Sequence, residues 1–307
     1  MKITMLGSLG HINQIVIPQL IAAGHTVTVI TSSPKRVAAI EALGATAAVG
    51  TMADGQFLTQ QFQNQDVVYL MISGPAFNTT DMIAGAKAQG EIFYQAIQTA
   101  QVKNVVDLSS IGADAGPEAG ALYAYHFIED QLKQLTDVNL AFVRPVGFYS
   151  NLYSHLSNIK AHHRLATPND PNLLAAYVAP ADIAAVILPL LTQTPAGVSV
   201  HYAISDMFTL NEFVTTLQQT PALADLKIDL ISDAQYAAAL ATNKLPQTVI
   251  DNFVQMVRFE RDPEKVYRDL KQHHPTYGHV KLADFARAYV QAILGDADDA
   301  KANTIVS

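Results

Sequence analysis

The 307-residue chain contains no cysteine and no tryptophan. The lack of cysteine excludes disulfides, thiolate chemistry and cysteine metal sites, and it fits a reducing compartment. Basic residues are also few, because 19 Lys and Arg stand against 27 Asp and Glu and give a net charge of −8. Direct binding of nucleic acid requires a basic face, so this balance argues against a nucleic-acid partner.

Signals for membranes and metals are missing as well. No apolar run is long enough to cross a bilayer, and the chain starts in a predicted strand without the charged and apolar regions of a signal peptide. We therefore expect a soluble cytoplasmic protein with no membrane partner. The pairs His162-His163 and His273-His274 lack ligand spacing on a helix face, so we expect no metal.

The remaining composition is that of a globular protein, because half of the residues are apolar and 15% are charged. Apolar runs alternate with helical patterns through about residue 145, which is typical of a parallel α/β sheet with both faces covered. The predicted strands are 2–6, 26–30, 46–49, 67–72, 104–108 and 139–143. The predicted helices between them are 12–23, 34–43, 55–63, 79–100 and 121–135.

From about residue 146 the alternation loosens. The predicted elements of this part are helices at 151–165, 179–192 and 210–219, a helix-rich stretch at 233–257, a last amphipathic helix at 281–294, and one strand at 198–204. We therefore expect an α/β fold with a nucleotide-binding domain over 1–150. A smaller α/β substrate-binding region over 151–307 packs on it, and the two could share strands.

A glycine turn joins the first strand to the first helix. Gly7 and Gly10 lie in this turn, directly before a predicted helix N-terminus. Free backbone N–H groups and the helix dipole at such a turn favour the pyrophosphate of a dinucleotide. Asn13 replaces the third glycine of the usual pattern, so we expect it to push the helix outward or to point along the groove. An ordinary strand-to-helix turn is the alternative interpretation.

The loop after the second strand distinguishes NAD from NADP. It reads Thr31-Ser32-Ser33-Pro34-Lys35-Arg36, with hydroxyls and cations but no acidic residue. An NAD site usually has an acidic residue here, which accepts a hydrogen bond from the ribose 2′-hydroxyl, whereas small polar and basic residues suit the 2′-phosphate of NADP(H). Ser33 could also simply cap a helix whose first residue is Pro34, and both roles are compatible.

Several further segments resemble one family. They are Gly24-His25-Thr26-Val27, 101–110 (QVKNVVDLSS), 144–152 (RPVGFYSNL), 181–186 (ADIAAV) and 208–213 (FTLNEF). Together with the glycine turn and Ser32-Ser33-Pro34-Lys35, they resemble the NmrA-like atypical short-chain dehydrogenase/reductases over nearly the whole length. The resemblance implies a doubly wound Rossmann-type sheet, a small C-terminal substrate domain and a preference for NADP(H). Members of that family reduce quinones or plant phenylpropanoids, and others bind the nucleotide as regulators.

The predicted cofactor-binding residues lie at the carboxyl ends of the first, second, fourth and fifth strands. They are Gly7, Ser8, Leu9, Gly10, His11, Ile12, Thr31, Ser32, Ser33, Lys35, Arg36, Met71, Ile72, Ser73 and Ser109. The family often has Arg at the position of Ser32, so the 2′-phosphate would depend on Ser33, Lys35 and Arg36.

The usual proton donor of short-chain dehydrogenases, a Tyr-x-x-x-Lys pair, is not assembled. Tyr123 is followed four residues later by Phe127, and Tyr125 by Glu129. Tyr125 and His126 are the remaining catalytic candidates, although a histidine near a helix start is more often a cap or a surface residue.

The predicted substrate pocket consists of Ser110, Tyr125, Phe148 and Tyr149. Ser109 and Ser110 end the strand that would carry the serine of the family's site, and helix or turn capping is an equal alternative for them. Phe148 and Tyr149 could line a flat apolar pocket or form ordinary packing.

We predict an NADP(H)-binding oxidoreductase that transfers hydride to a quinone-like or small carbonyl substrate. A quinone suits the missing tyrosine–lysine pair, because its reduced form is delocalised and easily protonated. A non-catalytic NADP(H)-sensing regulatory protein is the alternative. A homodimer or a regulatory protein partner also remains open.

Overall fold

The computed structural model describes residues 1–72 and 80–295, so the predicted cofactor residue Ser73 lies outside the described part of the chain. The chain forms two compact units. Unit 1 contains Met1–Ala115, Leu122–Arg144 and Ala184–Tyr202. Unit 2 contains Gly116–Ala121, Pro145–Ile183 and the residues from Ala203 onward.

Unit 1 is built on a seven-stranded sheet with the order β10-β6-β5-β4-β1-β2-β3. The neighbouring pairs among β1 to β6 are parallel. The strands are β1 (Lys2–Met5), β2 (Thr26–Thr31), β3 (Thr46–Val49), β4 (Val67–Met71), β5 (Asn104–Leu108), β6 (Asn139–Pro145) and β10 (Val198–Ala203). The order reverses between β1 and β4, which makes the sheet doubly wound and confirms the predicted fold class.

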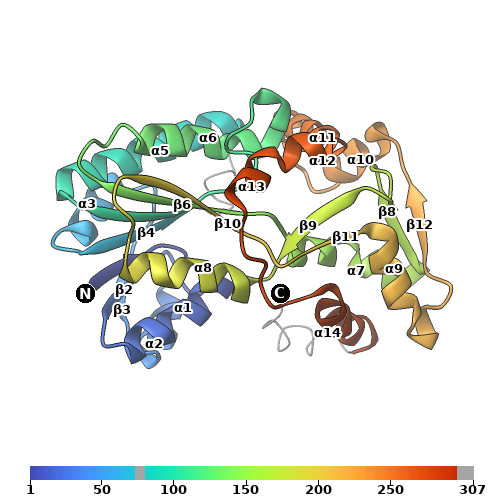
Figure 1. Cartoon of the computed structure of the whole chain (residues 1–307), viewed down its shortest axis with the longest axis horizontal. Coiled ribbons are helices and arrows are strands. Elements are labelled where there is room, and N and C mark those ends of the chain that lie inside the picture. The colour runs from blue at the N-terminus through green and yellow to red at the C-terminus, as the bar shows by residue number, and fades with distance from the viewer. Residues whose placement is uncertain (73–79, 296–307) are drawn as a thin grey trace. The chain divides into compact units, whose positions relative to one another are not determined.

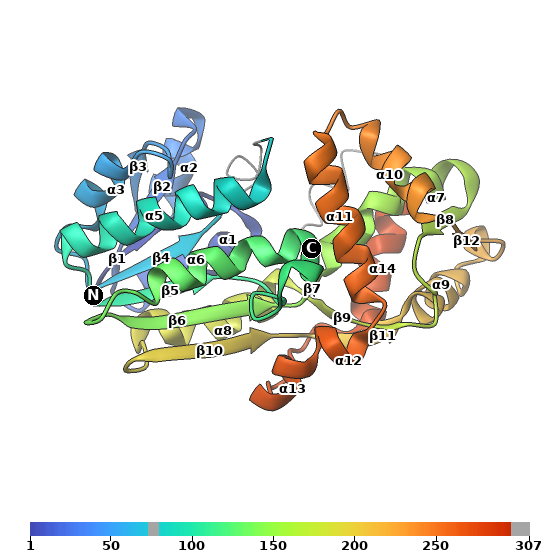
Figure 2. The same ribbon diagram turned by 90° about the horizontal axis from the view of Figure 1, so that it is seen from above.

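Helices cover both faces of this sheet. Figures 1 and 2 show α3 (Gly55–Phe62), α5 (Met82–Ala100) and α6 (Ala124–Leu132) on one face. On the other face lie α1 (His11–Ala22), α2 (Val37–Ala42) and α8 (Pro180–Thr192). The strands are apolar runs because each of their faces meets a helix layer. On the α5 side the core includes Val68, Leu70, Phe93, Val105, Ile128 and Phe142.

Unit 2 contains a three-stranded sheet, β11-β9-β7, and a two-stranded sheet, β12-β8. Its strands are β7 (Gly147–Phe148), β8 (Arg164–Thr167), β9 (Leu174–Val178), β11 (Asp206–Thr209) and β12 (Lys227–Leu230). Its helices are α7 (Leu156–His162), α9 (Leu210–Gln218), α10 (Asp233–Ala241), α11 (Gln247–Glu260), α12 (Pro263–Val266), α13 (Arg268–His273) and α14 (Leu282–Leu294). An aromatic core with Tyr149, Phe208, Phe213 and Phe285 packs β11, α9 and α14 together.

The division of the chain differs from the predicted boundary at residue 150. Ala184–Tyr202 belongs to unit 1, because β10 extends the sheet beside β6 and the later part of α8 covers it.

The predicted helix at 151–165 is also shorter than expected. It consists of a 3₁₀ segment, Tyr149–His155, and α7, and it ends where His163 adopts a left-handed φ of 52° before β8.

In residues 1–72 and 80–295, no helix combines the length and the apolar character that a membrane span requires.

Candidate functional site

The glycine turn after β1 has the backbone form of an anion site. Gly7 has a φ of +94°, and the Gly10 N–H donates to the Gly7 carbonyl at 3.1 Å. A Cβ at Gly10 would lie 3.2 Å from that same oxygen, so a side chain there would crowd the turn. Gly10 has no side chain with which to cap α1, which begins at His11. The first N–H groups of this helix are therefore available to an anion.

The Asn13 side chain does not point along the groove. Its side chain is buried and turns back into the glycine turn, where Nδ2 donates to the carbonyl oxygens of Leu6 at 2.7 Å and Ser8 at 2.9 Å. A Cβ on Gly7 would lie 3.2 Å from this Nδ2 atom. The side chain that replaces the third glycine therefore holds the turn through two hydrogen bonds, and the predicted orientation along the groove is wrong.

The other predicted residues around the turn differ in exposure. Leu9 and Ile12 are half-buried, and His11 is exposed. At the end of β4, Met71 lies beside Gly7, because a Cβ on that glycine would be 3.2 Å from Met71 Cγ. Ile72 is buried. The structure thus brings the ends of β1 and β4 together at the glycine turn.

The loop after β2 lies next to the same turn. Thr31 is buried, and its Oγ1 accepts a hydrogen bond from the Ser8 hydroxyl at 2.9 Å. Ser32, Lys35 and Arg36 are exposed. Two cations therefore stand on a loop that is joined by a hydrogen bond to the glycine turn.

The structure of this loop agrees only in part with the prediction from the sequence. The predicted helix at 34–43 begins as a 3₁₀ turn, Pro34–Arg36, and continues as α2. Ser33 occupies the N-cap position, but its side chain makes no capping hydrogen bond in the described structure. The capping role that we considered for Ser33 is therefore limited to the backbone, and the hydroxyl can serve a ligand.

A buried charge network supports the end of β5. The Ser109 hydroxyl donates to Glu129 Oε1 on α6 at 2.7 Å. Arg144 at the end of β6 holds Glu129 with two hydrogen bonds, Nε to Oε1 at 2.9 Å and Nη2 to Oε2 at 2.7 Å. Lys133 Nζ also donates to Glu129, at 3.1 Å. The Ser109 hydroxyl proton is thus committed to Glu129, and its oxygen can only accept from a ligand.

The electrostatics of Glu129 follow from these contacts. Burial alone would raise the pKa of its carboxyl, but the hydrogen bonds and charge of Arg144, with help from Ser109 and Lys133, lower that pKa below its ordinary value. Glu129 is fully buried and remains ionised at neutral pH. In the sequence it occupies the position four residues after Tyr125, where a lysine would complete the usual catalytic pair.

Tyr125 has the opposite environment to an activated tyrosine. Burial, and then the nearby Asp107 carboxyl, raise the pKa of its phenol to about 12. In the Tyr-x-x-x-Lys pair a lysine lowers this pKa so that the tyrosine can exchange its proton. Tyr125 can therefore donate a hydrogen bond but does not ionise near neutral pH.

Asp107 is a titratable group that our interpretation of the sequence did not include. It lies within the apolar strand β5 and is 3% exposed. Burial, and then the charge of Glu129, raise the pKa of its carboxyl well above the ordinary range. A single acidic residue inside an otherwise apolar strand was the signal that could have identified it.

His126 is held by structural contacts. Its Nδ1 lies 3.0 Å from the Ala113 carbonyl, which can only accept, so Nδ1 carries a proton. Its Nε2 lies 3.3 Å from Asp130 one helical turn later. The ring stacks on Tyr123 with 4.9 Å between the centroids. These contacts favour a structural role for His126.

The predicted pocket residues belong to different units. Ser110 and Tyr125 are half-buried in unit 1, and Phe148 is half-buried on β7 of unit 2. Tyr149 is fully buried in unit 2, where it stacks on Phe285 at 4.5 Å and donates its hydroxyl to a backbone carbonyl at 3.2 Å. For Tyr149 the structure therefore favours core packing over a pocket.

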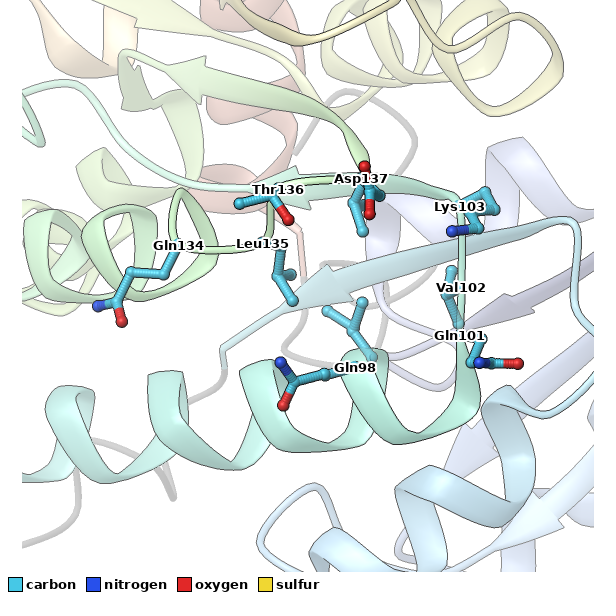
Figure 3. A pocket seen from close by; sticks show the side chains of 10 residues that line it. Gln98, Gln101, Val102, Lys103, Gln134, Leu135, Thr136 and Asp137 are labelled. Carbon is cyan, nitrogen blue, oxygen red and sulfur yellow. The ribbon is translucent and has the colours of Figure 1, made fainter.

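A hollow on unit 1 lies at the other end of the sheet. Figure 3 shows it between the end of α5 and the segments that precede β5 and β6. Val102 and Leu135 are buried in it, and Gln98, Lys103 and Asp137 are exposed. It faces the amino ends of the strands, whereas cofactors bind at the carboxyl ends. It is therefore separate from the candidate cofactor site.

Comparisons with known proteins identify the family of this chain. The model of a family described as NAD(P)H-binding matches residues 7–194, more than half of the chain. No curated protein matches the sequence significantly.

Solved structures share the fold at low sequence identity. An NADPH-dependent quinone oxidoreductase from Escherichia coli, in complex with NADPH, is 19% identical with a TM-score of 0.72, covering 93% of this chain and 98% of that one. The Citrobacter sp. triphenylmethane reductase with NADP(H) is 14% identical with a TM-score of 0.74, covering 94% and 100%. UDP-glucose 4-epimerase from Bifidobacterium longum with NAD⁺ and UDP is 12% identical with a TM-score of 0.64, covering 94% and 97%. The resemblance to NmrA-like atypical short-chain dehydrogenase/reductases is thus confirmed for the fold.

Proposed function

Since this chain belongs to the NAD(P)H-binding family, we propose that it binds NADP(H) and reduces a quinone-like or small carbonyl substrate by hydride transfer. The observation that carries the cofactor choice is the acid-free loop at the end of β2, with Ser33, Lys35 and Arg36. This loop is hydrogen-bonded to the glycine turn through Ser8 and Thr31. NADP(H) offers a pyrophosphate to the turn and a 2′-phosphate to the loop.

Two segments of the chain would bind different parts of NADP(H). The backbone N–H groups of His11 and Ile12 would hold the pyrophosphate at the N-terminus of α1, next to Gly10, where a Cβ would crowd the turn. Ser33, Lys35 and Arg36 would hold the 2′-phosphate, with the Arg36 guanidinium suited to a bidentate contact.

Bound NADPH would supply the hydride, and this chain's residues would bind and orient the substrate. Tyr125, with a pKa near 12, can donate a hydrogen bond to a substrate oxygen without ionising. Reduction of a quinone fits such a site, because the product anion is delocalised and water can protonate it. A substrate that needs a strong general acid fits the site less well.

A second function is supported by the same electrostatics. The raised pKa of Tyr125 and the structural contacts of His126 leave no activated proton donor between these two catalytic candidates. This arrangement suits an NADP(H)-sensing regulatory protein that does not turn over substrate. We propose the reductase first, and a cytoplasmic location for either function.

The test combines binding and turnover. We expect NADPH to bind more tightly than NADH, and Arg36→Ala to weaken NADPH by about 1–3 kcal/mol through loss of a charge-assisted contact, with NADH nearly unchanged. Arg287→Ala is the control, because Arg287 is an exposed arginine of α14. Equal affinities of the wild-type protein for both cofactors contradict the NADP(H) proposal. Tight NADPH binding without oxidation of NADPH by quinones or aldehydes favours the regulatory function.

A further inference from the structure

Ser8 in the glycine turn has a backbone conformation that is unfavourable for a residue with a side chain. Its φ is 51°, in the left-handed region, and it follows directly on Gly7. Two buried hydrogen bonds oppose this cost. The Ser8 N–H donates to the Ile30 carbonyl at 3.1 Å, and the Ser8 hydroxyl donates to Thr31 Oγ1 at 2.9 Å. The end of β2 therefore helps to hold the glycine turn in its observed form.

The Thr31 hydroxyl serves the neighbouring loop at the same time. Its Oγ1 accepts a second hydrogen bond from the Ser33 N–H at 3.2 Å. Among the described residues, its own proton is donated to the Ser33 carbonyl, at 3.4 Å. A hydroxyl accepts two hydrogen bonds and donates one, so this group is fully used. One oxygen thus links Ser8 of the glycine turn to Ser33 of the basic loop.

Thr31, which we predicted as a cofactor-binding residue, is shielded from solvent. It is 2% exposed, and its carbonyl accepts from the Gly50 N–H at 2.9 Å, which fixes its backbone as well. The side chain therefore acts through Ser8 and Ser33, which makes it a positioning residue.

We propose that Thr31 couples the pyrophosphate and 2′-phosphate sites and thereby sets the preference for NADP(H) over NAD(H). This inference rests on the proposed function and adds a residue that determines its specificity. Without the hydroxyl, Ser33 and the cations after it lose their fixed distance from the glycine turn. NADP(H), which has a pyrophosphate and a 2′-phosphate, then loses more affinity than NAD(H), whose pyrophosphate contacts only the glycine turn.

The experiment titrates NADPH, NADH and adenosine 2′,5′-bisphosphate into wild-type protein, Thr31→Val, Thr31→Ser and Ser8→Ala. Thr31→Val keeps the shape of the side chain but leaves the Ser8 hydroxyl and the Ser33 N–H without this acceptor. We expect NADPH affinity to fall roughly tenfold and NADH affinity by roughly threefold or less, as for lost buried hydrogen bonds. Thr31→Ser should restore the wild-type preference. Ser8→Ala, which removes the same contact from the other side, should lower the preference in part.

Thr28→Val is the matched control, because Thr28 is a half-buried residue of the same strand and belongs to neither segment. It should leave the ratio of the two affinities unchanged. Circular dichroism and the melting temperature establish that each variant is folded.

The outcomes separate this inference from the proposed function. If wild-type protein does not prefer NADPH, the proposed function fails and the coupling fails with it. If wild-type protein prefers NADPH but Thr31→Val and Ser8→Ala lose NADPH and NADH affinity equally, the hydroxyl supports only the turn and the coupling is refuted. An unchanged ratio in both variants refutes it in the same way.

Discussion

Replacing Arg144 by methionine should destabilise the protein strongly, because it removes one partner of a buried ion pair. Glu129 is fully buried, and the Arg144 side chain is 5% exposed. Their two hydrogen bonds, at 2.9 and 2.7 Å, form a bidentate contact. Removal of one partner from such a pair costs about 3–5 kcal/mol. Lys133 and Ser109 still contact Glu129 in the variant. We therefore expect the free energy of unfolding to fall by about 3 kcal/mol, at the lower end of this range.

The assay is urea unfolding followed by circular dichroism. The control is Arg164→Met, which makes the same substitution in the Arg164–Asp229 pair, where both side chains are nearly half exposed. Exposed pairs contribute about 0–1 kcal/mol, so the two variants should differ clearly. The double variant Glu129→Gln/Arg144→Met should recover part of the loss, because it leaves no buried charge at this position.

Acid should reduce the cost of Arg144→Met. The folded-state pKa of Glu129 lies below its unfolded value, so its contribution is complete above the unfolded pKa of about 4.3 and disappears as pH falls through the lower folded pKa. The difference between wild type and variant should therefore be largest near neutral pH. This account of the pair is refuted if Arg144→Met lowers the free energy of unfolding no more than Arg164→Met does. It is also refuted if the effect of Arg144→Met does not change with pH.

Three further predictions follow from the site. Gly10→Val should abolish NADPH binding in titrations while the melting temperature stays close to that of wild type; normal NADPH binding by this variant would place the site elsewhere. Asp107→Asn should gain stability relative to wild type as pH rises above about 4, because the raised folded pKa makes the native protein bind more protons than the unfolded chain; a difference in melting temperature that does not grow with pH contradicts this. Tyr125→Phe should leave NADPH oxidation by quinones within a few-fold of wild type, whereas removal of a general acid costs roughly 10²–10⁴-fold.

Much of unit 1 could be predicted because its signals are local. The strands lie between two helix layers, and all seven strands of this sheet appear within two residues of their predicted bounds. The glycine turn and the basic loop are adjacent to these strands, so their sequence also indicates their position at the carboxyl edge. Each of these features depends on a short stretch of neighbouring residues.

The supporting contacts of the site could not be predicted in this way. The Ser8–Thr31 hydrogen bond joins residues 23 positions apart, and the Ser109–Glu129 bond joins residues 20 apart. Nothing local distinguishes Glu129 from an exposed glutamate of a helix. Its carboxylate is buried against Arg144, which lies on strand β6.

Unit 2 was harder to predict from the sequence because its strands are short and its core is built from residues that are far apart in the chain. Strands of two to five residues, such as β7 and β9, carry too few positions to show a periodic pattern. The local sequence around Tyr149 is compatible with either a pocket residue or a core residue. Its stacking on Phe285, from the far end of the chain, favours the core.

A crystal structure of the protein with bound NADPH tests the central claim most directly. We expect the pyrophosphate on the backbone N–H groups of His11 and Ile12, beside Gly10, with the 2′-phosphate within hydrogen-bond distance of Ser33 and Arg36. A nucleotide bound away from the glycine turn would contradict the proposed site. A 2′-phosphate that faces solvent, with no contact to the loop after β2, would contradict the proposed preference for NADP(H).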